Sequence, residues 1–328
     1  MYENSLVSNN IKKLIRCKKP AAIFSWQLFY KCNYNCSYCF EKKLDKFNFS
    51  IDELLKTSEN VYKYYKKYGF ELLSIIGGEA TLLEIDDFLS LFSHFIYETN
   101  LNFEIITNFY RPIDYFEKIC AFFSNLKRVT IKVSYHEEYN SIRNFFKKFE
   151  ELIKMSLKYN NVVPKIEFVI TEKTEEKDIE TVYSLYIYLK NKYKNKHIEL
   201  HLAEEFRYDK GWNLIYLYDS SKLAKKHPEY IKHLTQRRKY IVEKQDITFE
   251  GYSSDFLKSE SKILHTKGCR CTQNEMFLED NKLKNFCDRN IITDDFMNCD
   301  IEKLKINFTS ICKNDICTET FVSVENKI

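Results

Sequence analysis

Short apolar runs alternate with longer amphipathic ones between residues 21 and 202. The short runs are rich in β-branched and aromatic residues and predict six strands, over Ile23 to Tyr30, Phe70 to Ile76, Phe103 to Thr107, Arg128 to Ser134, Lys165 to Thr171 and His197 to Leu202. The longer runs have apolar residues at helical spacing and predict helices over Ser50 to Tyr68, with Ser50 as N-cap, Ile85 to Tyr97, Asp114 to Phe123, Tyr139 to Tyr159 and Lys177 to Lys190. Units of about 30 residues predict an α/β fold, a partial (β/α)6 TIM-like barrel.

The carboxyl ends of the predicted strands are where we expect the active site, because parallel barrels carry their catalytic residues there. Polar or small residues occur at each end: Gly77-Gly78-Glu79, Thr107-Asn108, Ser134-Tyr135-His136, Thr171-Glu172 and His201. With regular strand registers, His136 and His201 face the pocket, although an ordinary polar rim would also explain them. The first strand leads directly into a group of cysteines.

Cys32, Cys36 and Cys39 have the spacing C-x3-C-x2-C immediately after the first apolar run. Thiolates this close together hold a soft metal centre, and three of them leave one iron of a four-iron cluster without a protein ligand. Such an iron can bind a substrate or cofactor, as the open position of a catalytic zinc does. The alternative is a zinc ion completed by a distant His or Cys.

This loop, with Tyr38 before its last cysteine, resembles the signature of the radical S-adenosylmethionine (SAM) superfamily. The segment from Ser74 to Thr81 resembles the Gly-Gly-Glu motif of that family, and a plain turn is its alternative reading. The resemblance implies one 4Fe-4S cluster on Cys32, Cys36 and Cys39, with SAM at its open iron. It further implies that these residues contact SAM: Tyr38 near adenine, Gly77, Gly78 and Glu79 at the methionyl amine, and Thr107, Asn108 and Ser134 at ribose and carboxylate. For Thr107 and Asn108 a strand-ending turn is an equal alternative.

A second group of cysteines occupies the C-terminal part of the chain. Six of the 11 cysteines lie in the last 60 residues, which indicates a second metal site. A cysteine, a hairpin turning at Glu279-Asp280-Asn281, and a later C-x4-C pair resemble the twitch or SPASM appendage, a small cysteine-rich α+β unit. That resemblance implies one auxiliary 4Fe-4S cluster on Cys271, Cys287, Cys312 and Cys317, with Cys269 able to replace Cys271.

Other features of these cysteines leave alternatives open. A structural zinc on the same four ligands, or free thiols, would also fit. Asn281 stands where the family has Gly, but Asn tolerates a left-handed turn. Cys299 is spare, Cys120 in an apolar helix is expected to be a small buried hydrophobe, and Cys17 has no partner in the pattern.

We expect four parts in the chain: an N-terminal extension over 1–20, the barrel over 21–202, a bridge over 203–268 and the auxiliary-cluster appendage over 269–328. From Lys222 to Lys244, eight Lys or Arg accompany two Glu, and Tyr230, Ile231 and Leu234 fall at helical spacing. This pattern predicts a solvated amphipathic helix. An acidic partner is the alternative, but a net charge of +4 does not favour nucleic acid.

The composition of the chain argues against a membrane or secreted protein. The 39.5 kDa chain has no apolar stretch of 18 residues, and its N-terminus is polar and basic, so we expect a cytosolic protein with neither a signal peptide nor a membrane span. In that compartment the cysteines are metal ligands or free thiols rather than disulfides.

The resemblance implies an activity: reductive cleavage of SAM to methionine and a 5′-deoxyadenosyl radical, which takes a hydrogen atom from a substrate C–H. A flavodoxin or ferredoxin would supply the electron. We expect a peptide or protein substrate, modified by crosslinking, thioether formation or epimerisation. The alternatives are a small molecule or RNA as substrate, or a non-catalytic iron-sulfur sensor or electron carrier, which would need neither an open iron nor Gly-Gly-Glu.

Overall fold

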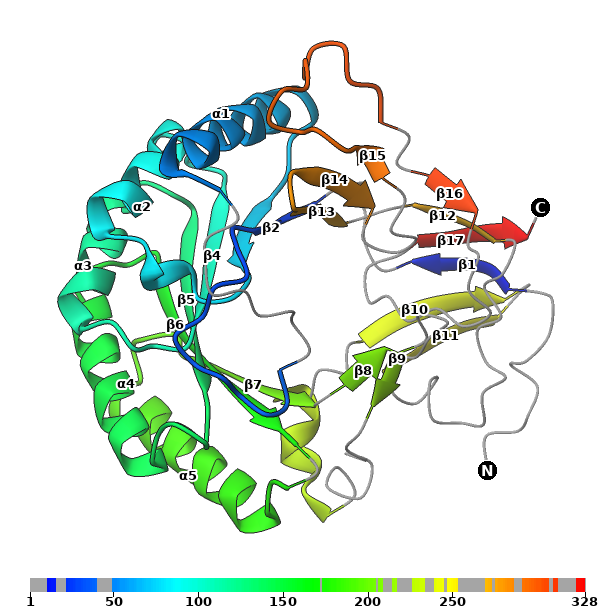
Figure 1. The fold of residues 1–328 in the computed structure, drawn as a ribbon. Helices are drawn as coiled ribbons and strands as arrows, with labels where there is room; N and C mark the ends of the chain where they lie inside the picture. The colour runs from blue at the N-terminus through cyan, green and yellow to red at the C-terminus, as the bar shows by residue number, and fades with distance from the viewer. Residues whose placement is uncertain are drawn as a thin grey trace.

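A nine-stranded sheet organises the part of the chain that the computed structural model describes, with strand order β15-β14-β13-β2-β3-β4-β5-β6-β7. The described residues are 11–15, 22–39, 49–171, 173–204, 206–208, 214–216, 226–233, 239–244, 247–252, 269–272, 275–285, 291–306, 309–311 and 323–327. Figure 1 shows helices along the outer face of this curved sheet, which does not close on itself. The prediction of a partial α/β barrel is confirmed.

The six predicted strands are all present and run parallel. They are β2 (Ile23–Gln27), β3 (Leu72–Ile76), β4 (Asn102–Thr107), β5 (Arg128–Tyr135), β6 (Val162–Ile170) and β7 (Glu199–Glu204). The helices between them are α1 (Ile51–Tyr68), α2 (Ile85–Leu91), α3 (Ile113–Phe122), α4 (Ile142–Ser156) and α5 (Glu176–Lys192).

Local sequence explains the ends of two helices. Ser50 caps α1 in a reciprocal capping box with Glu53, as predicted, and Gly69, with φ of +68°, ends it. The predicted helix over Ile85 to Tyr97 was too long, because α2 gives way to a 3-10 turn, η3 (Ser93–Phe95). There the Ser93 hydroxyl donates to the carbonyl of Ser90, a local bond that competes with helical bonding.

The two faces of the barrel sheet differ sharply in polarity. Side chains facing the helices are apolar and fully buried; Trp26 and Phe103, for example, both pack edge-on against Phe92. Because successive strand residues point to opposite faces, the alternate positions face the barrel interior. Most of those positions are polar, although apolar residues such as Ile76, Ile106 and Val163 also occur among them; the polar residues include Ser25, Gln27, Ser74, Glu104, Thr130, Lys132, Ser134, Lys165, Glu167, Glu199 and His201. A barrel interior that serves only as a packed core is lined by Val, Ile and Leu, so this inner face is built for another purpose.

The predicted C-terminal hairpin is present as β13 (Glu275–Glu279) and β14 (Lys282–Asn285). Asp280 and Asn281 at its turn have φ of 49° and 59°, the left-handed values of a two-residue hairpin loop. The hairpin extends the barrel sheet, because β13 runs parallel to β2 and β15 (Ile291–Thr293) follows β14. The Tyr30 hydroxyl, just before the cysteine loop, donates to Glu279 across 2.6 Å.

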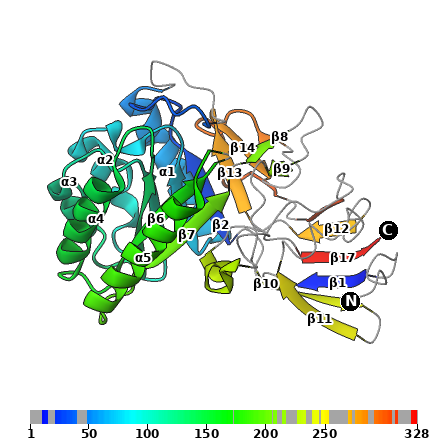
Figure 2. The same cartoon turned by 90° about the horizontal axis from the view of Figure 1, so that it is seen from below.

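A second sheet lies beside the barrel (Figure 2). Its six strands are β11 (Ile247–Tyr252), β10 (Lys239–Lys244), β1 (Ile11–Ile15), β17 (Ser323–Lys327), β12 (Cys269–Thr272) and β16 (Thr309–Ile311). A separate ribbon joins β8 (Phe206–Tyr208) to β9 (Leu214–Tyr216). The sheet pairs β1, near the start of the sequence, with β17, near its end.

The predicted helix from Lys222 to Lys244 is wrong. The described residues of that range form a 3-10 helix, η4 (Pro228–His233), and then strand β10. Tyr230 is buried against Tyr183, and the β-branched Ile241 and Val242 pair with β1 and β11. Long-range pairing therefore decides the structure of residues 239–244, which lie beyond the residues at helical spacing.

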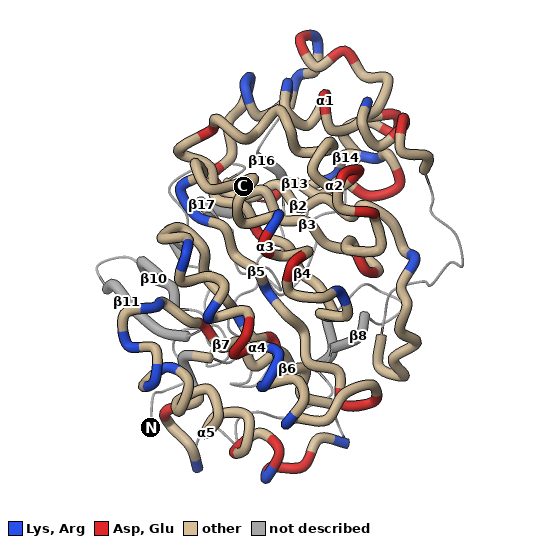
Figure 3. Tube along the Cα trace, turned by 90° about the vertical axis from the view of Figure 1, so that its left-hand side faces the viewer, with Lys and Arg blue, Asp and Glu red and all other residues tan. Residues whose placement is uncertain are grey.

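The charge and hydropathy of the helices relate to the predictions about nucleic acid and about a membrane span. Basic and acidic residues are interspersed over the helical face in Figure 3, so neither sign dominates it. None of the described helices combines the length and the apolar character needed to cross a bilayer.

Candidate functional site

The cysteine loop follows β2 at the carboxyl end of the barrel strands. Cys36 is buried, Cys32 is partly buried and Cys39 is exposed, so the three thiols run from the interior to the surface. The loop folds back on itself, since the amide of Cys39 donates to the carbonyl of Cys36 across 3.2 Å and the amide of Tyr34 lies 3.4 Å from Cys32 Sγ. The structure thus presents three sulfurs from one short segment.

The Gly-Gly-Glu segment packs directly against the start of this loop. A β-carbon on Gly78 would lie 2.0 Å from the carbonyl oxygen of Lys31, and one on Gly77 would lie 2.7 Å from that of Phe29. Gly77 also has φ of +99°. The amide of Glu79 donates to the Lys31 carbonyl across 2.9 Å. These glycines let two backbone segments touch, a role that the sequence reasoning assigned to ligand approach alone.

Glu79 is almost completely buried, and its carboxylate accepts hydrogen bonds on both oxygens. Oε1 accepts from the amide and hydroxyl of Thr81 and from the Thr107 hydroxyl at 2.8 Å, while Oε2 accepts from the amide of Asn108 at 2.5 Å. Burial raises the pKa of this carboxyl, and the four donors oppose that rise by stabilising its charge. Glu79 therefore joins the ends of β3 and β4.

Asn108 continues the connection from Glu79 to the cysteines. Its side-chain Nδ2 lies 2.7 Å from Asn33 Oδ1 and 3.8 Å from Cys32 Sγ. Thr107, Asn108 and Glu79, three of the predicted SAM contacts, are thus brought together around the first cysteine. In the described structure each of them bonds to protein.

The segment after β5 contacts the loop from the other side. His136 Nδ1 lies 3.4 Å from Cys36 Sγ and 2.6 Å from the Tyr38 hydroxyl, and the Tyr38 ring stacks on His136. Tyr139 stacks on Tyr34 with ring centroids 4.1 Å apart, and the Glu138 carboxylate accepts from Ser37. Burial raises the pKa of Tyr38, so its phenol keeps its proton. The prediction that His136 faces the site is confirmed.

Two charged residues on the inner face of β5 and β6, Lys132 and Glu167, were not predicted from the sequence as site residues. Glu167 pairs with the Lys132 ammonium and with His201 Nδ1 at 2.8 Å, and it accepts from the Ser134 hydroxyl at 3.2 Å. Burial alone would raise the pKa of Glu167, but Lys132 and His201 hold it well below its ordinary value. Ser134, predicted to contact SAM, points at Glu167. In the sequence, Lys132 and Glu167 alternate with apolar residues within their strands, and this alternation could have identified them as inward-facing charges.

The donor set at the loop suits an iron-sulfur cluster better than a single ion. Sulfurs around one tetrahedral zinc lie about 3.8 Å apart, given Zn–S bonds of about 2.3 Å. Among the described residues the three cysteine sulfurs do not all come within 4.8 Å of one another, whereas one His and two Glu do. Cysteine thiolates are the usual ligands of a 4Fe-4S cluster. Cys32, Cys36 and Cys39 can therefore hold three of its irons.

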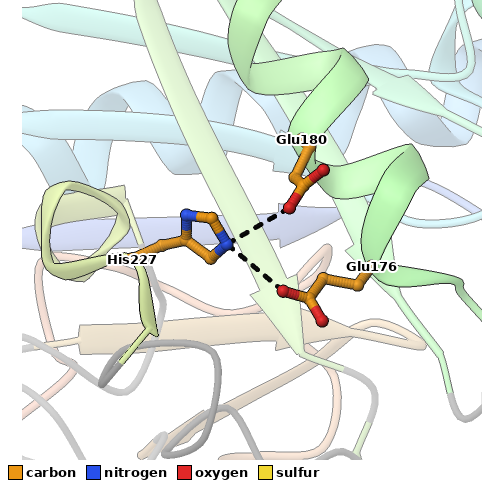
Figure 4. A group of neighbouring side chains, drawn as sticks. All are labelled: Glu176, Glu180 and His227. Carbon is orange, nitrogen blue, oxygen red and sulfur yellow. Dashed lines mark hydrogen bonds and ion pairs between the residues drawn. The ribbon is translucent and has the colours of Figure 1, made fainter.

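That other group, Glu176, Glu180 and His227, joins α5 to the segment before η4 (Figure 4). His227 Nε2 lies 3.2 Å from Glu176 and 3.3 Å from Glu180. The Lys226 ammonium already pairs with Glu176 at 2.5 Å. The group is thus a partly exposed polar cluster, with one Lys–Glu ion pair, that ties two segments together.

The remaining cysteines include those predicted to hold the auxiliary cluster. Cys269 and Cys271 lie in β12, of which the backbone is described, and Cys17, Cys287, Cys312 and Cys317 lie outside the described residues. Cys299 is partly buried on the turn after β15, and Cys120 is fully buried, as predicted. The auxiliary cluster stays a prediction.

Parts of this chain are similar to known proteins. Residues 23–151, which include the cysteine loop and Gly-Gly-Glu, match the family model described as a 4Fe-4S single cluster domain. A Methanocaldococcus jannaschii protein named as a glycyl-radical enzyme activating enzyme is 42% identical over 55 residues, 17% of this chain and 20% of that protein. The chain thus spans one fifth of the length of this curated relative.

Solved structures show the same fold. Native anSMEcpe, solved with bound AdoMet (SAM) and the Cp18Cys peptide, has a TM-score of 0.51 at 15% identity, over 86% of this chain and 80% of anSMEcpe. Its complex with AdoMet and the Kp18Cys peptide gives a TM-score of 0.50 at 16% identity over the same shares.

Together the 4Fe-4S family model and the shared fold agree with the resemblance of the two motifs to the radical SAM superfamily. The family model supports an iron-sulfur cluster at this loop, and AdoMet is bound in the anSMEcpe structures that share the fold. In radical SAM terms, the two motifs that were separate in the sequence meet at the ends of β2, β3 and β4.

Proposed function

We propose that this chain is a radical SAM enzyme that modifies a peptide or protein at a C–H bond. The observation that carries the proposal is the contact between its two motifs, in which Gly78 lies against the Lys31 carbonyl and Glu79 donates its amide to it. Cys32, Cys36 and Cys39 would hold the cluster. When bound, the cluster supplies the electron that cleaves SAM into methionine and a 5′-deoxyadenosyl radical.

The chain's own residues position the reactants. The loop hydrogen bonds around Cys32 and Cys36 fix the sulfurs, and buried Glu79 holds the strand ends beneath them. Ser134, Glu167 and His201 are register partners on β5, β6 and β7 and so form one layer across the inner face. Ser134 precedes His136 by two residues, and strand residues two apart lie about 7 Å from one another. The layer therefore lies about 7 Å from His136 along the strands, toward the barrel interior. This polar wall is where we expect the substrate to bind.

Two observations favour a peptide over a small molecule. The inner face offers cations and carboxylates from several neighbouring strands, a surface suited to the amides and charged side chains of a peptide. The similar fold of anSMEcpe is known with a peptide bound. An auxiliary cluster on Cys271, Cys287, Cys312 and Cys317, with Cys269 as substitute, and a flavodoxin or ferredoxin as electron donor, are part of this proposal.

The first test is anaerobic reconstitution of the full chain with iron and sulfide. The triple variant with Cys32, Cys36 and Cys39 changed to Ala should hold about four irons fewer than the wild type and form no 5′-deoxyadenosine with dithionite and SAM. Cys120→Ala is the matched control and should retain both. Zinc in place of iron, or SAM cleavage by the triple variant, would contradict the proposal.

The substrate class needs its own test. Deuterated peptides from a protein digest should transfer deuterium to 5′-deoxyadenosine, whereas deuterated sugars and nucleosides should not. Transfer from a sugar or nucleoside, with none from the peptides, would overturn the peptide assignment and leave the radical SAM assignment intact.

A further inference from the structure

The side chain of Asn108 has a fixed orientation toward the cysteine loop. Its Oδ1 accepts from the amide of Tyr110 at 3.2 Å, which leaves the Nδ2 hydrogens for the opposite direction. There Nδ2 donates to Asn33 Oδ1 at 2.7 Å and to Cys32 Sγ at 3.8 Å. Because the Tyr110 amide can only donate, the amide group of Asn108 cannot be reversed without losing that bond.

The backbone of Asn108 is fixed as firmly as its side chain. Its amide donates to Glu79 Oε2, and the Thr107 hydroxyl donates to Oε1 of the same carboxylate. Asn108 is 5% exposed and Glu79 is 1% exposed, so water does not compete for these bonds. The Gly-Gly-Glu motif therefore reaches the first cysteine through one residue.

The other cysteine contact of this kind is less defined. His136 Nδ1 lies near Cys36 Sγ at 3.4 Å, but the Tyr38 hydroxyl shares that nitrogen at 2.6 Å. One nitrogen can donate a hydrogen or accept one, and either neighbour can be its partner. Asn108 Nδ2 is always a donor, as is the backbone amide of Tyr34 at 3.4 Å from the same sulfur, and among the side chains described at these sulfurs Asn108 is the one whose N–H direction is fixed.

We propose that Asn108 is a positioning residue that donates a hydrogen bond to the Cys32 sulfur and thereby raises the reduction potential of the cluster. This inference rests on the proposed function, in which Cys32 is a cluster ligand. A reduced cluster carries one more negative charge than the oxidised one, and an N–H donor at a ligand sulfur stabilises that charge. Loss of the donor should make the cluster harder to reduce.

The test is an EPR-monitored redox titration of the anaerobically reconstituted chain without SAM. Asn108→Leu removes the donor, and Asn108→Ser keeps a hydroxyl able to accept from the Tyr110 amide while being too short to reach Cys32. Both should shift the midpoint potential to more negative values. Asn102→Leu, at the opposite end of β4 where Asn102 donates to the Glu71 carbonyl, is the matched control and should keep the wild-type potential.

The outcomes separate this inference from the proposed function. A wild-type chain that binds no iron refutes the cluster itself, before any variant is compared. If Asn108→Leu does not fold, Asn108→Ser decides. A variant that folds but takes up less iron than Asn102→Leu supports the positioning role, and full iron content with an unchanged potential in Asn108→Ser overturns the proposal.

Discussion

Gly78 and the carbonyl of Lys31 are in direct backbone contact, so close that a β-carbon on Gly78 would lie 2.0 Å from the oxygen and 2.6 Å from the carbon of that group. Both partners are backbone, which can yield only by displacing the cysteine loop. The contact links residues from two strand ends that are far apart in the sequence.

Gly78→Ala should therefore displace the loop, destabilise the chain by about 3 kcal/mol and lower its iron content after reconstitution. Gly69→Ala is the control, because its cost comes from a positive φ at the end of α1 and not from the loop of Cys32, Cys36 and Cys39. That variant should lose thermal stability and keep its iron. Equal iron content in the two variants would show that the contact does not shape the cysteine loop.

His201 should make stability depend on pH. Burial lowers the pKa of His201 from 6.5 to about 4. Between these values the unfolded chain binds a proton that the folded chain does not, so stability falls as the pH is lowered through this range. Glu167, whose pKa is also lowered, adds to the loss below its ordinary value of 4.5.

Urea unfolding at about pH 7 and about pH 5 measures this effect. The wild type should lose more stability between the two than His201→Asn, which lacks the titrating ring. An equal loss in both proteins would mean that His201 is not buried in its neutral form.

Asn60 on α1 holds the turn that contains Cys299. Its Nδ2 donates to the carbonyls of Phe296, Met297 and Cys299 at 2.9, 3.1 and 3.2 Å. Asn60→Leu leaves these acceptors without that donor and should cost about 2 kcal/mol.

Hydrogen exchange should then speed up in residues 294–304 and stay unchanged in α4. Lys63→Met, on the same helix, removes an exposed pair with Glu59 and should change stability by less than about 0.5 kcal/mol. If exchange in residues 294–304 is unchanged in Asn60→Leu, Asn60 does not anchor the turn.

The thiols should differ in reactivity before the cluster is loaded. Cys39 is exposed, whereas Cys120 is fully buried and its burial raises the pKa of the thiol to about 12. Iodoacetamide on the reduced chain should label Cys39 within minutes and leave Cys120 unlabelled until denaturant is added, as read by mass spectrometry. Early labelling of Cys120 would show that α3 opens readily.

Local sequence sufficed for much of the barrel. Strand and helix periodicity, the Ser50 cap and the left-handed Asp280-Asn281 turn depend on interactions within a few residues, and each was predictable. Prediction failed for residues 239–244, which were expected to end a helix beginning at Lys222 but form a strand that pairs with β1 and β11.

The sequence alone determined which chemical groups this protein brings to its site: three thiols at fixed spacing, a Gly-Gly-Glu turn, and polar residues at strand ends. The tertiary structure decided which of them meet. Parallel strand register puts Glu167 beside His201 and Ser134, and Gly78 against Lys31, because β-sheet pairing aligns residues that no local pattern relates. The contact of Asn108 with Cys32 likewise depends on the distance between the ends of β2 and β4, which only the tertiary structure sets.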